Sequence, residues 1–273
     1  MIEIIKQIIC DKSPVLKTKN FSTMIPKTVH LTYKTREVPE HWKPSIKKWS
    51  DLGWKVMFHT DATNLHLVET EYPQHLTKYL AFRHPIERVD FVRLCFLHKW
   101  GGVYCDLDLV PAYDFYNEIK DCELALLCSP VDHKTFTNMF MVGRAGHPFW
   151  AEYMDGCSVD SPLWAIGKHM HIMYSTGPLK MDSVVRKTKH SFTRLGQDWI
   201  TCTICDLDED DASALCGDGK LLVVRGQSWN GWDSRVYKFF FCNKQQLLIT
   251  GGLCVALYII YKQTKKSPLK VES

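Results

Sequence analysis

The stretch from Trp100 to Pro111, WGGVYCDLDLVP, decides how the rest of the chain is interpreted. After a double glycine it alternates apolar residues with two aspartates, a pattern typical of a β-strand. If residues 102–110 form one strand, Asp106 and Asp108 point to the same face, because alternate side chains share a side. Two neighbouring carboxylates repel each other, which favours a divalent cation with oxygen ligands between them. The alternative is a pair of solvated aspartates at the end of a strand.

A helix is expected directly before this strand. Residues 86–100 carry apolar side chains at steps of three or four residues, and Gly101-Gly102 follows as a C-terminal cap and turn. Asp90 interrupts the apolar stripe, and Arg93 lies one helical turn later. A surface ion pair is the ordinary interpretation. A pair packed beside the carboxyl end of the strand would instead let Asp90 accept sugar hydroxyls and Arg93 face phosphate.

Working outward, four more candidate strands lie at residues 28–33, 55–59, 123–128 and 138–142. They alternate with amphipathic helical stretches, which predicts an α/β fold with a mostly parallel sheet covered by helices. With 273 residues, of which 45% are hydrophobic, the chain is large enough for one substantial domain. We expect an N-terminal extension over 1–23, the domain itself over 24–238, and a hydrophobic segment with a basic tail over 239–273.

The charge balance and the cysteine pattern exclude some classes of protein. The chain carries 34 Lys and Arg residues against 30 Asp and Glu residues, which is too balanced for a protein that neutralises nucleic-acid phosphates. Its 11 cysteines lack the dense spacing of small disulfide-stabilised secreted domains, so reduced thiols are expected. Cys202-x-x-Cys205 has no second pair at the spacing of zinc ligands.

The sequence CDLD of residues 105–108 occurs a second time at residues 205–208. No apolar strand precedes the second copy, and the residues after it do not continue as a strand. It also fails as a calcium-binding EF-hand loop, because Asp211 stands where glycine is required. We interpret the second copy as a solvated acidic loop.

The segment from Leu247 to Tyr261 is uncharged and strongly apolar, and lysines follow at positions 262, 265, 266 and 270. As a helix it would be roughly 22 Å long, which is short for a hydrocarbon core of about 30 Å. A segment that lies at the membrane interface fits this length, so we expect membrane association through the residues after about 240. The N-terminus lacks a secretory signal pattern, which predicts a catalytic domain on the cytosolic side. A buried terminal element is the alternative.

With these residues assembled, the chain resembles the DXD-motif sugar transferases of glycosyltransferase family 32. This family includes yeast-type α-1,6-mannosyltransferases and is more remotely related to the clostridial toxin glucosyltransferases. The resemblance covers roughly residues 24 to 235, and the block from Arg88 to Asp108 is its most specific part. Other stretches match the family in the expected order along the chain, at residues 25–30, 138–141, 146–150, 176–178 and 228–229.

The resemblance implies a GT-A fold, in which a Rossmann-like sheet binds a UDP- or GDP-sugar and Mn²⁺ or Mg²⁺ sits on the DXD aspartates. It implies a retaining transfer of a hexose to a hydroxyl group of a glycan, lipid or protein, and we assign no nucleophile. Asp108 and Asp106 would hold the metal and act in catalysis. The donor-binding residues that the resemblance implies are His30, Tyr33, Asp90, Arg93, Asp106, Asn138, Ser228 and Trp229.

Two other functions stay open. The sequence DLDLV of residues 106–110 also fits the nucleophile motif of haloacid-dehalogenase-type phosphatases, although roughly a hundred residues precede it and no matching acidic motif follows. The third possibility is an α/β binding module that keeps a metal and nucleotide-sugar site without turnover. Release of nucleoside diphosphate, of inorganic phosphate, or of neither distinguishes the three.

Overall fold

The computed structural model describes residues 24–207, 211, 213–226, 231–250 and 258. The expected N-terminal extension over 1–23 and most of the apolar segment after residue 247 lie outside these residues. The strands are β1 (Thr28–Tyr33), β2 (Lys55–Thr60), β3 (Gly102–Cys105), β4 (Leu109–Pro111), β5 (Leu124–Cys128), β6 (Phe136–Gly143), β7 (Thr193–Leu195) and β8 (Leu221–Val223). The helices are η1 (Glu40–Trp42), α1 (Lys43–Asp51), α2 (Asp61–Glu71), α3 (Pro73–Ala81), α4 (Pro85–Trp100), α5 (Tyr116–Ile119), α6 (Pro148–Gly156), α7 (Gly167–Ser175), α8 (Pro178–Val185) and α9 (Trp232–Cys242).

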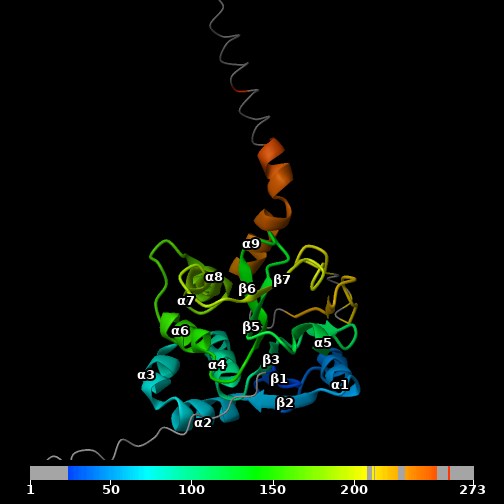
Figure 1. The fold of residues 1–273 in the computed structure, drawn as a ribbon. Coiled ribbons are helices and arrows are strands. Elements are labelled where there is room, and N and C mark those ends of the chain that lie inside the picture. The colour runs from blue at the N-terminus through cyan, green and yellow to red at the C-terminus, as the bar shows by residue number, and fades with distance from the viewer. Residues whose placement is uncertain (1–23, 208–210, 212, 227–230, 251–257, 259–273) are drawn as a thin grey trace, which may run out of the picture.

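Six strands form the central sheet in the order β2-β1-β3-β6-β5-β7 (Figure 1). Strand β1 is parallel to β2 and β3, and β7 is parallel to β5, whereas β6 is antiparallel to both of its neighbours. Three of the five neighbouring pairs are therefore parallel. The predicted fold class, an α/β fold with a Rossmann-like, mostly parallel sheet flanked by helices, is confirmed.

Both faces of this sheet are buried. Along β5, Leu124 and Leu126 pack into one apolar cluster, while Ala125 and Leu127 pack into the other. The first cluster includes side chains of α2, α3, α4, α6 and α8, which gather on one side of the sheet in Figure 1. The second includes side chains of α1 and α5 on the opposite side. Burial on both faces explains why the central strands are nearly continuous apolar runs.

The strand predicted over residues 102–110 is two strands in the structure. β3 ends at Cys105, and residues 106–108 form a turn that is closed by a hydrogen bond from the Leu109 amide to the Asp106 carbonyl (3.1 Å). β4 then leaves the central sheet and pairs antiparallel with β8. The two aspartates thus lie at the carboxyl end of β3, and not along one strand face, since period-2 alternation stops at the turn.

The helix predicted over 86–100 is α4, which leads into β3. Pro85 occupies its first turn, and the Glu87 carboxylate accepts a hydrogen bond from the His84 amide (2.8 Å). The helix ends at Gly101, whose φ of +65° is in the left-handed region. At Gly102 a Cβ would lie 2.5 Å from the Thr28 carbonyl oxygen, so the glycine lets β3 approach β1.

The expectation of reduced thiols is wrong for four of the cysteines. Cys202 is disulfide-bonded to Cys216, and Cys205 to Cys242, at sequence separations of 14 and 37 residues. These long separations carry no signal in the sequence, because the loop after β7 has to fold before the pairs meet. The cysteines of the β-sheet region, including Cys105, remain free.

Helix α9 crosses the domain boundary that we expected between residues 238 and 239. The Tyr237 ring stacks on His169 of α7 with 5.2 Å between the ring centroids, and Cys242 is bonded to the domain through Cys205. We therefore propose that the domain extends through Cys242. Across the described part of the chain, no helix combines the length and the apolar character that a membrane crossing requires.

Candidate active site

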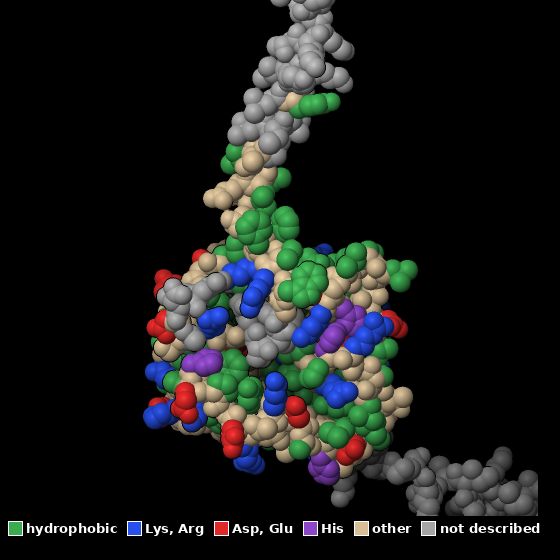
Figure 2. Space-filling model, turned by 180° about the vertical axis from the view of Figure 1, so that it is seen from behind, with side chains coloured by type: hydrophobic (Ala, Val, Ile, Leu, Met, Phe, Trp, Pro, Cys, Tyr) green, Lys and Arg blue, Asp and Glu red, His purple; other side chains and the backbone are tan. Residues whose placement is uncertain are grey.

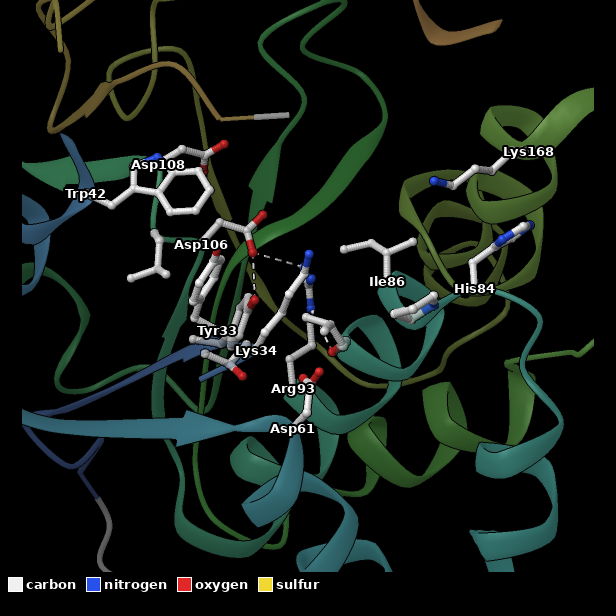
Figure 3. Close-up of a pocket in the computed structure, with 15 residues that line it drawn as sticks. Tyr33, Lys34, Trp42, Asp61, His84, Ile86, Arg93, Asp106, Asp108 and Lys168 are labelled. Atoms are coloured by element: carbon white, nitrogen blue, oxygen red, sulfur yellow. Dashed lines mark hydrogen bonds and ion pairs between the residues drawn. The ribbon is translucent and has the colours of Figure 1, made fainter. Parts of the chain in front are cut away.

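A pocket of about 250 Å³ lies where β1 and β3 end and α4 begins. The carboxyl ends of parallel strands are the edge at which open α/β sheets bind ligands. Figure 3 shows Asp106 near the centre, with Asp108 and Trp42 on one side and Lys168 and His84 on the other. The side chains that line the pocket belong to Thr32, Tyr33, Lys34, Trp42, Asp61, His84, Pro85, Ile86, Val89, Arg93, Tyr104, Asp106, Leu107, Asp108 and Lys168.

Arg93 is the fixed charge at the base of the pocket, and only 2% of it is exposed. Its guanidinium lies 3.0 Å from Asp90 Oδ1 and 3.4 Å from Asp106 Oδ1, and it donates to the Asn138 carbonyl at 2.7 Å. It also lies over the Tyr104 ring, 4.4 Å from the centroid. Burial alone would lower the pKa of Arg93, but the nearby Asp106 carboxylate raises it, so the side chain stays charged.

Asp90 supports Arg93 from below and does not line the pocket itself. The Asn138 amide donates to Asp90 Oδ1 at 2.9 Å, and the Thr176 hydroxyl donates to Oδ2 at the same distance. Burial raises the pKa of Asp90 to about 6, although the Arg93 charge opposes that shift. Both carboxylate oxygens of Asp90 therefore have donors. Thr176, which supplies one of them, lies outside the helix that carries Asp90, so the apolar pattern of that helix does not reveal it.

The two turn aspartates differ in their partners. Asp106 accepts a hydrogen bond of 2.6 Å from the Tyr104 hydroxyl, which burial keeps protonated by raising its pKa, and it faces Arg93. Among the described residues, no side chain donates a hydrogen bond to the Asp108 carboxylate. Burial, and secondly repulsion from Asp106, raises the pKa of Asp108 to about 7. A half-buried carboxylate to which no described side chain donates a hydrogen bond is suited to bind a cation.

The donor set at this turn fits a hard divalent cation such as Mn²⁺ or Mg²⁺. Asp106 and Asp108 supply carboxylate oxygens, and a diphosphate in the pocket would supply others. The described residues contain no group of three or more His, Cys, Asp or Glu side chains arranged to hold a metal. A site that shares its metal with substrate oxygens needs few protein ligands. Mg²⁺ in particular is often bound by one or two carboxylates together with substrate phosphates, and Asp106 and Asp108 supply two.

The segment after β8 closes one side of the site. The Val224 amide donates to the Asp108 carbonyl at 2.9 Å, and the Trp42 indole donates to the Arg225 carbonyl at 3.0 Å. A Cβ on residue 226 would lie 1.8 Å from Asp108 Oδ2, so only glycine fits at Gly226. Neither Trp42 nor Gly226 stands in a recognisable sequence motif, so only the folded chain shows that they belong to the site.

The residues expected to bind the donor fall into four groups, of which His30 forms the last by itself. Tyr33, Arg93 and Asp106 line the pocket, and Tyr33 lies edge-on to Trp42 with 5.6 Å between the ring centroids. Asp90 and Asn138 lie behind Arg93, where they hold it in place. Ser228 and Trp229 lie outside the described residues, although the segment that leads to them reaches Asp108.

His30 does not reach the pocket, although it was expected among the donor-binding residues. It is completely buried. Its Nδ1 lies 3.1 Å from His59 Nε2, its Nε2 lies 2.9 Å from the Gly101 carbonyl, and its ring stacks on Phe96. Burial lowers the pKa of His30 to about 4, so the ring is neutral. It joins β1 to the turn that precedes β3, which is a structural role.

Comparison with known proteins agrees with this geometry. Residues 37–125 match the family described as glycosyltransferase sugar-binding region containing DXD motif. Mannosyl phosphorylinositol ceramide synthase SUR1 of Saccharomyces cerevisiae is 33% identical over 61% of this chain and 43% of its own length. Inositol phosphoceramide mannosyltransferase 3 of Schizosaccharomyces pombe is 34% identical over 59% of this chain and 44% of its own length. The chain therefore matches less than half of either relative.

Among solved structures, the PaToxG glycosyltransferase has a TM-score of 0.44 and 14% identity, covering 60% of this chain and 70% of its own. The predicted resemblance to the DXD-motif sugar transferases is confirmed, since residues 37–125 match that sugar-binding region. The match to this family and the two curated relatives favour a transferase over the phosphatase alternative.

Proposed function

We propose that the chain is a metal-dependent glycosyltransferase that moves a hexose from a nucleoside-diphosphate sugar to a hydroxyl acceptor, with retention of configuration. One observation carries this proposal: the buried Arg93 is fixed between Asp90 and Asp106, beside Asp108 at the carboxyl end of β3. A site for a sugar diphosphate needs a fixed cation, carboxylates for a metal, and a cavity at this edge of the sheet.

Within this site each group has a separate task. Tyr33 and Trp42 offer aromatic surface beside a nucleobase, and Arg93 keeps Asp106 oriented toward the pocket. A divalent ion held by Asp106 and Asp108 would stabilise the negative charge that develops on the leaving diphosphate. The bond between the anomeric carbon and the diphosphate oxygen breaks, the acceptor oxygen forms the new bond, and its proton passes to the departing diphosphate. We assign no protein nucleophile.

We infer that the hexose is mannose and that the acceptor is an inositol-containing sphingolipid. The names of the matched relatives from Saccharomyces cerevisiae and Schizosaccharomyces pombe support this inference. The membrane association expected from the apolar segment between Leu247 and Tyr261 would bring the chain to such an acceptor.

We also infer that the catalytic domain resides in an oxidising compartment, which replaces the cytosolic placement expected from the sequence. Two disulfides connect the loop after β7 to itself and to α9. Disulfides persist in the secretory pathway and are rare in the cytosol, where thiols are kept reduced. Non-reducing peptide mapping of the chain from its native membrane fraction tests this inference. Linked Cys205 and Cys242 peptides support it, and free thiols at both positions overturn it.

The proposed activity is tested by incubating the full chain with a panel of UDP- and GDP-sugars, with and without Mn²⁺. We expect nucleoside diphosphate to be released when Mn²⁺ is present, and the release to be largest with GDP-mannose when inositol phosphoceramide is added. Release of inorganic phosphate would favour the phosphatase, and release of neither product would favour a binding module. Asp108→Ala should abolish the release.

A further inference from the structure

Helix α9 leaves the domain through an apolar surface, to which the loop before α7 also contributes. We call this the exit surface and define it by the exposed side chains of Leu163, Trp164, Ile166, Trp232, Phe239 and Phe240. Leu163 is fully exposed, and Ile166 and Trp232 are each 77% exposed. Single exposed apolar residues are ordinary, but a contiguous patch of this kind marks an interaction site.

The two segments of the exit surface are held together by specific contacts. The Tyr237 hydroxyl donates to the Ile166 carbonyl at 3.2 Å, and the Asp233 carboxylate accepts from the His169 amide at 2.7 Å. The Trp164 ring packs edge-on against Tyr174 of α7, with 4.6 Å between the centroids. The loop before α7 and the face of α9 therefore form one built surface. Figure 2 shows hydrophobic side chains gathered where the C-terminal helix leaves the body.

Most charges around this surface are basic, and the nearby acid Asp160 is paired with Arg83 at 2.7 Å. On the described residues of α9 and just beyond it, Arg235 and Lys244 are exposed, whereas the carboxylate of Asp233 is buried in the helix start. Lys168 is the one residue with a formal charge in the sequence from Ser161 to Met170. Figure 2 shows Lys and Arg side chains beside the apolar ones. Aromatic and aliphatic side chains next to Lys and Arg are the composition of segments that insert into the interface of anionic membranes.

The exit surface also adjoins the active-site pocket. Lys168 and His84 line both the active-site pocket and a shallower neighbouring pocket, and Leu163 and Ala165 line the latter. The exposed apolar side chains continue past α9 to Leu248 and Ile249. A membrane that covered the exit surface would thus lie against the mouth of the catalytic pocket.

We propose that the exit surface docks on an anionic lipid bilayer and orients the pocket mouth toward it, so that a lipid acceptor reaches the site from the membrane plane. Only the statement about the acceptor rests on the proposed function, because docking requires no turnover. This surface is separate from the segment after Leu247, which would attach the chain without orienting it.

Quenching of tryptophan fluorescence by brominated acyl chains tests the contact. The full chain is mixed with phosphatidylcholine vesicles that contain phosphatidylinositol and brominated lipid, and is compared with Trp164→Phe. We expect the intact chain to be quenched more than the variant, because Trp164 contributes part of the quenched emission. Equal fractional quenching of the two chains would overturn the proposal, even if both chains bind vesicles through their C-terminal segment.

Vesicle partitioning gives a second measurement. Leu163→Ser combined with Ile166→Ser should weaken partitioning to phosphatidylinositol vesicles about tenfold, since both side chains lose their apolar contact with the bilayer. Leu80→Ser is the matched control, because Leu80 is an exposed leucine on α3, and it should leave partitioning unchanged. Equal partitioning of the double variant and the control would contradict docking.

Two further readouts separate the outcomes. Mn²⁺-dependent release of nucleoside diphosphate without lipid should be the same in the double variant and the intact chain, so a failure of docking and a failure of the proposed function are distinguishable. Sedimentation velocity without vesicles tests the other occupant of the surface. A dimer that the double variant dissociates would assign the exit surface to a second copy of this chain and would overturn the proposal.

Discussion

The same four residues, CDLD, stand at two places in this molecule and behave in opposite ways. In residues 105–108 the cysteine is a buried free thiol, and Asp106 faces a buried arginine. In residues 205–208 the cysteine is disulfide-bonded, and Asp206 accepts hydrogen bonds from the amide and hydroxyl of Thr203. The difference comes from what precedes each copy, since only the first follows a buried strand. A short acidic motif has chemical meaning only in the place where the fold puts it.

The largest expected effect separates the two copies by activity. Asp108→Ala should lower sugar transfer by about a thousandfold or more, because it removes a carboxylate from the proposed metal site. Asp206→Ala, the matched change in the second copy, should leave transfer within about twofold, since Asp206 closes an exposed turn. Steady-state rates with saturating donor and Mn²⁺ measure both. Similar losses of activity in the two variants would contradict the assignment of catalysis to residues 105–108.

The partners of the two acids should differ in their contribution to stability. Arg93→Gln leaves Asp90 and Asp106 without their buried cation and should lower the free energy of unfolding by about 3 kcal/mol or more. Thr203→Ala removes an exposed hydroxyl from Asp206 and should cost about 1 kcal/mol. Urea denaturation of each variant gives these values. A loss for Arg93→Gln no greater than for Thr203→Ala would contradict the buried network.

The cysteines of the two copies provide a third contrast. Replacing Cys205 and Cys242 together by alanine should destabilise the domain by about 3 kcal/mol, because the bond closes a loop of 37 residues. Cys105→Ala should cost about 1 kcal/mol, as a small cavity does. Adding a reductant should destabilise the intact chain by at least as much, because it also opens Cys202–Cys216, and should leave the Cys105→Ala difference unchanged. Insensitivity of the intact chain to reductant would argue against the disulfide.

The smallest expected effect is in pH dependence, and its sign differs between the copies. Burial raises the pKa of Asp108 to about 7, so without metal the domain loses stability as the pH rises from about 4 to 7. The hydrogen bonds from Thr203 lower the pKa of Asp206, which therefore stabilises the domain above its unfolded pKa and stops doing so as the pH falls. Asp108→Asn should raise the metal-free unfolding temperature at pH 8, whereas Asp206→Asn should lower it.

These pH effects are checked by thermal unfolding in the presence of a chelator at pH 4 and pH 8. The Asp108→Asn gain should be absent at pH 4, where the wild-type carboxyl group is already protonated. A gain of the same size at both pH values would show that the side chain is not titrating as described.

The parts of the fold that the sequence predicts are those with a local pattern. Helix α4 was recognisable from its apolar repeat, and its end from Gly101-Gly102. The turn at Asp106 was not, because the alternation of residues 102–110 continues through it and only pairing of β4 with β8 separates the strands. Contacts between distant segments decide such points.

The candidate site divides in the same way. Asp90, Arg93, Asp106 and Asp108 were recognised because they stand in one continuous block. The hydroxyl of Thr176, which completes the partners of Asp90, lies 86 residues further along. Gly226 and the disulfide partners are likewise defined by tertiary approach. A pattern that spans a few residues therefore identifies the chemistry, while the supporting contacts appear only in the folded chain.

We propose that residues 105–108, and not residues 205–208, hold a divalent cation together with a nucleoside diphosphate. Electron paramagnetic resonance of Mn²⁺ tests it most directly, because the signal of the free ion falls when the ion is bound. We expect the intact chain and Asp206→Ala to bind Mn²⁺ more tightly when GDP or UDP is added, and Asp108→Ala to show no such gain. A gain in Asp108→Ala equal to that of the intact chain would contradict the proposed metal site.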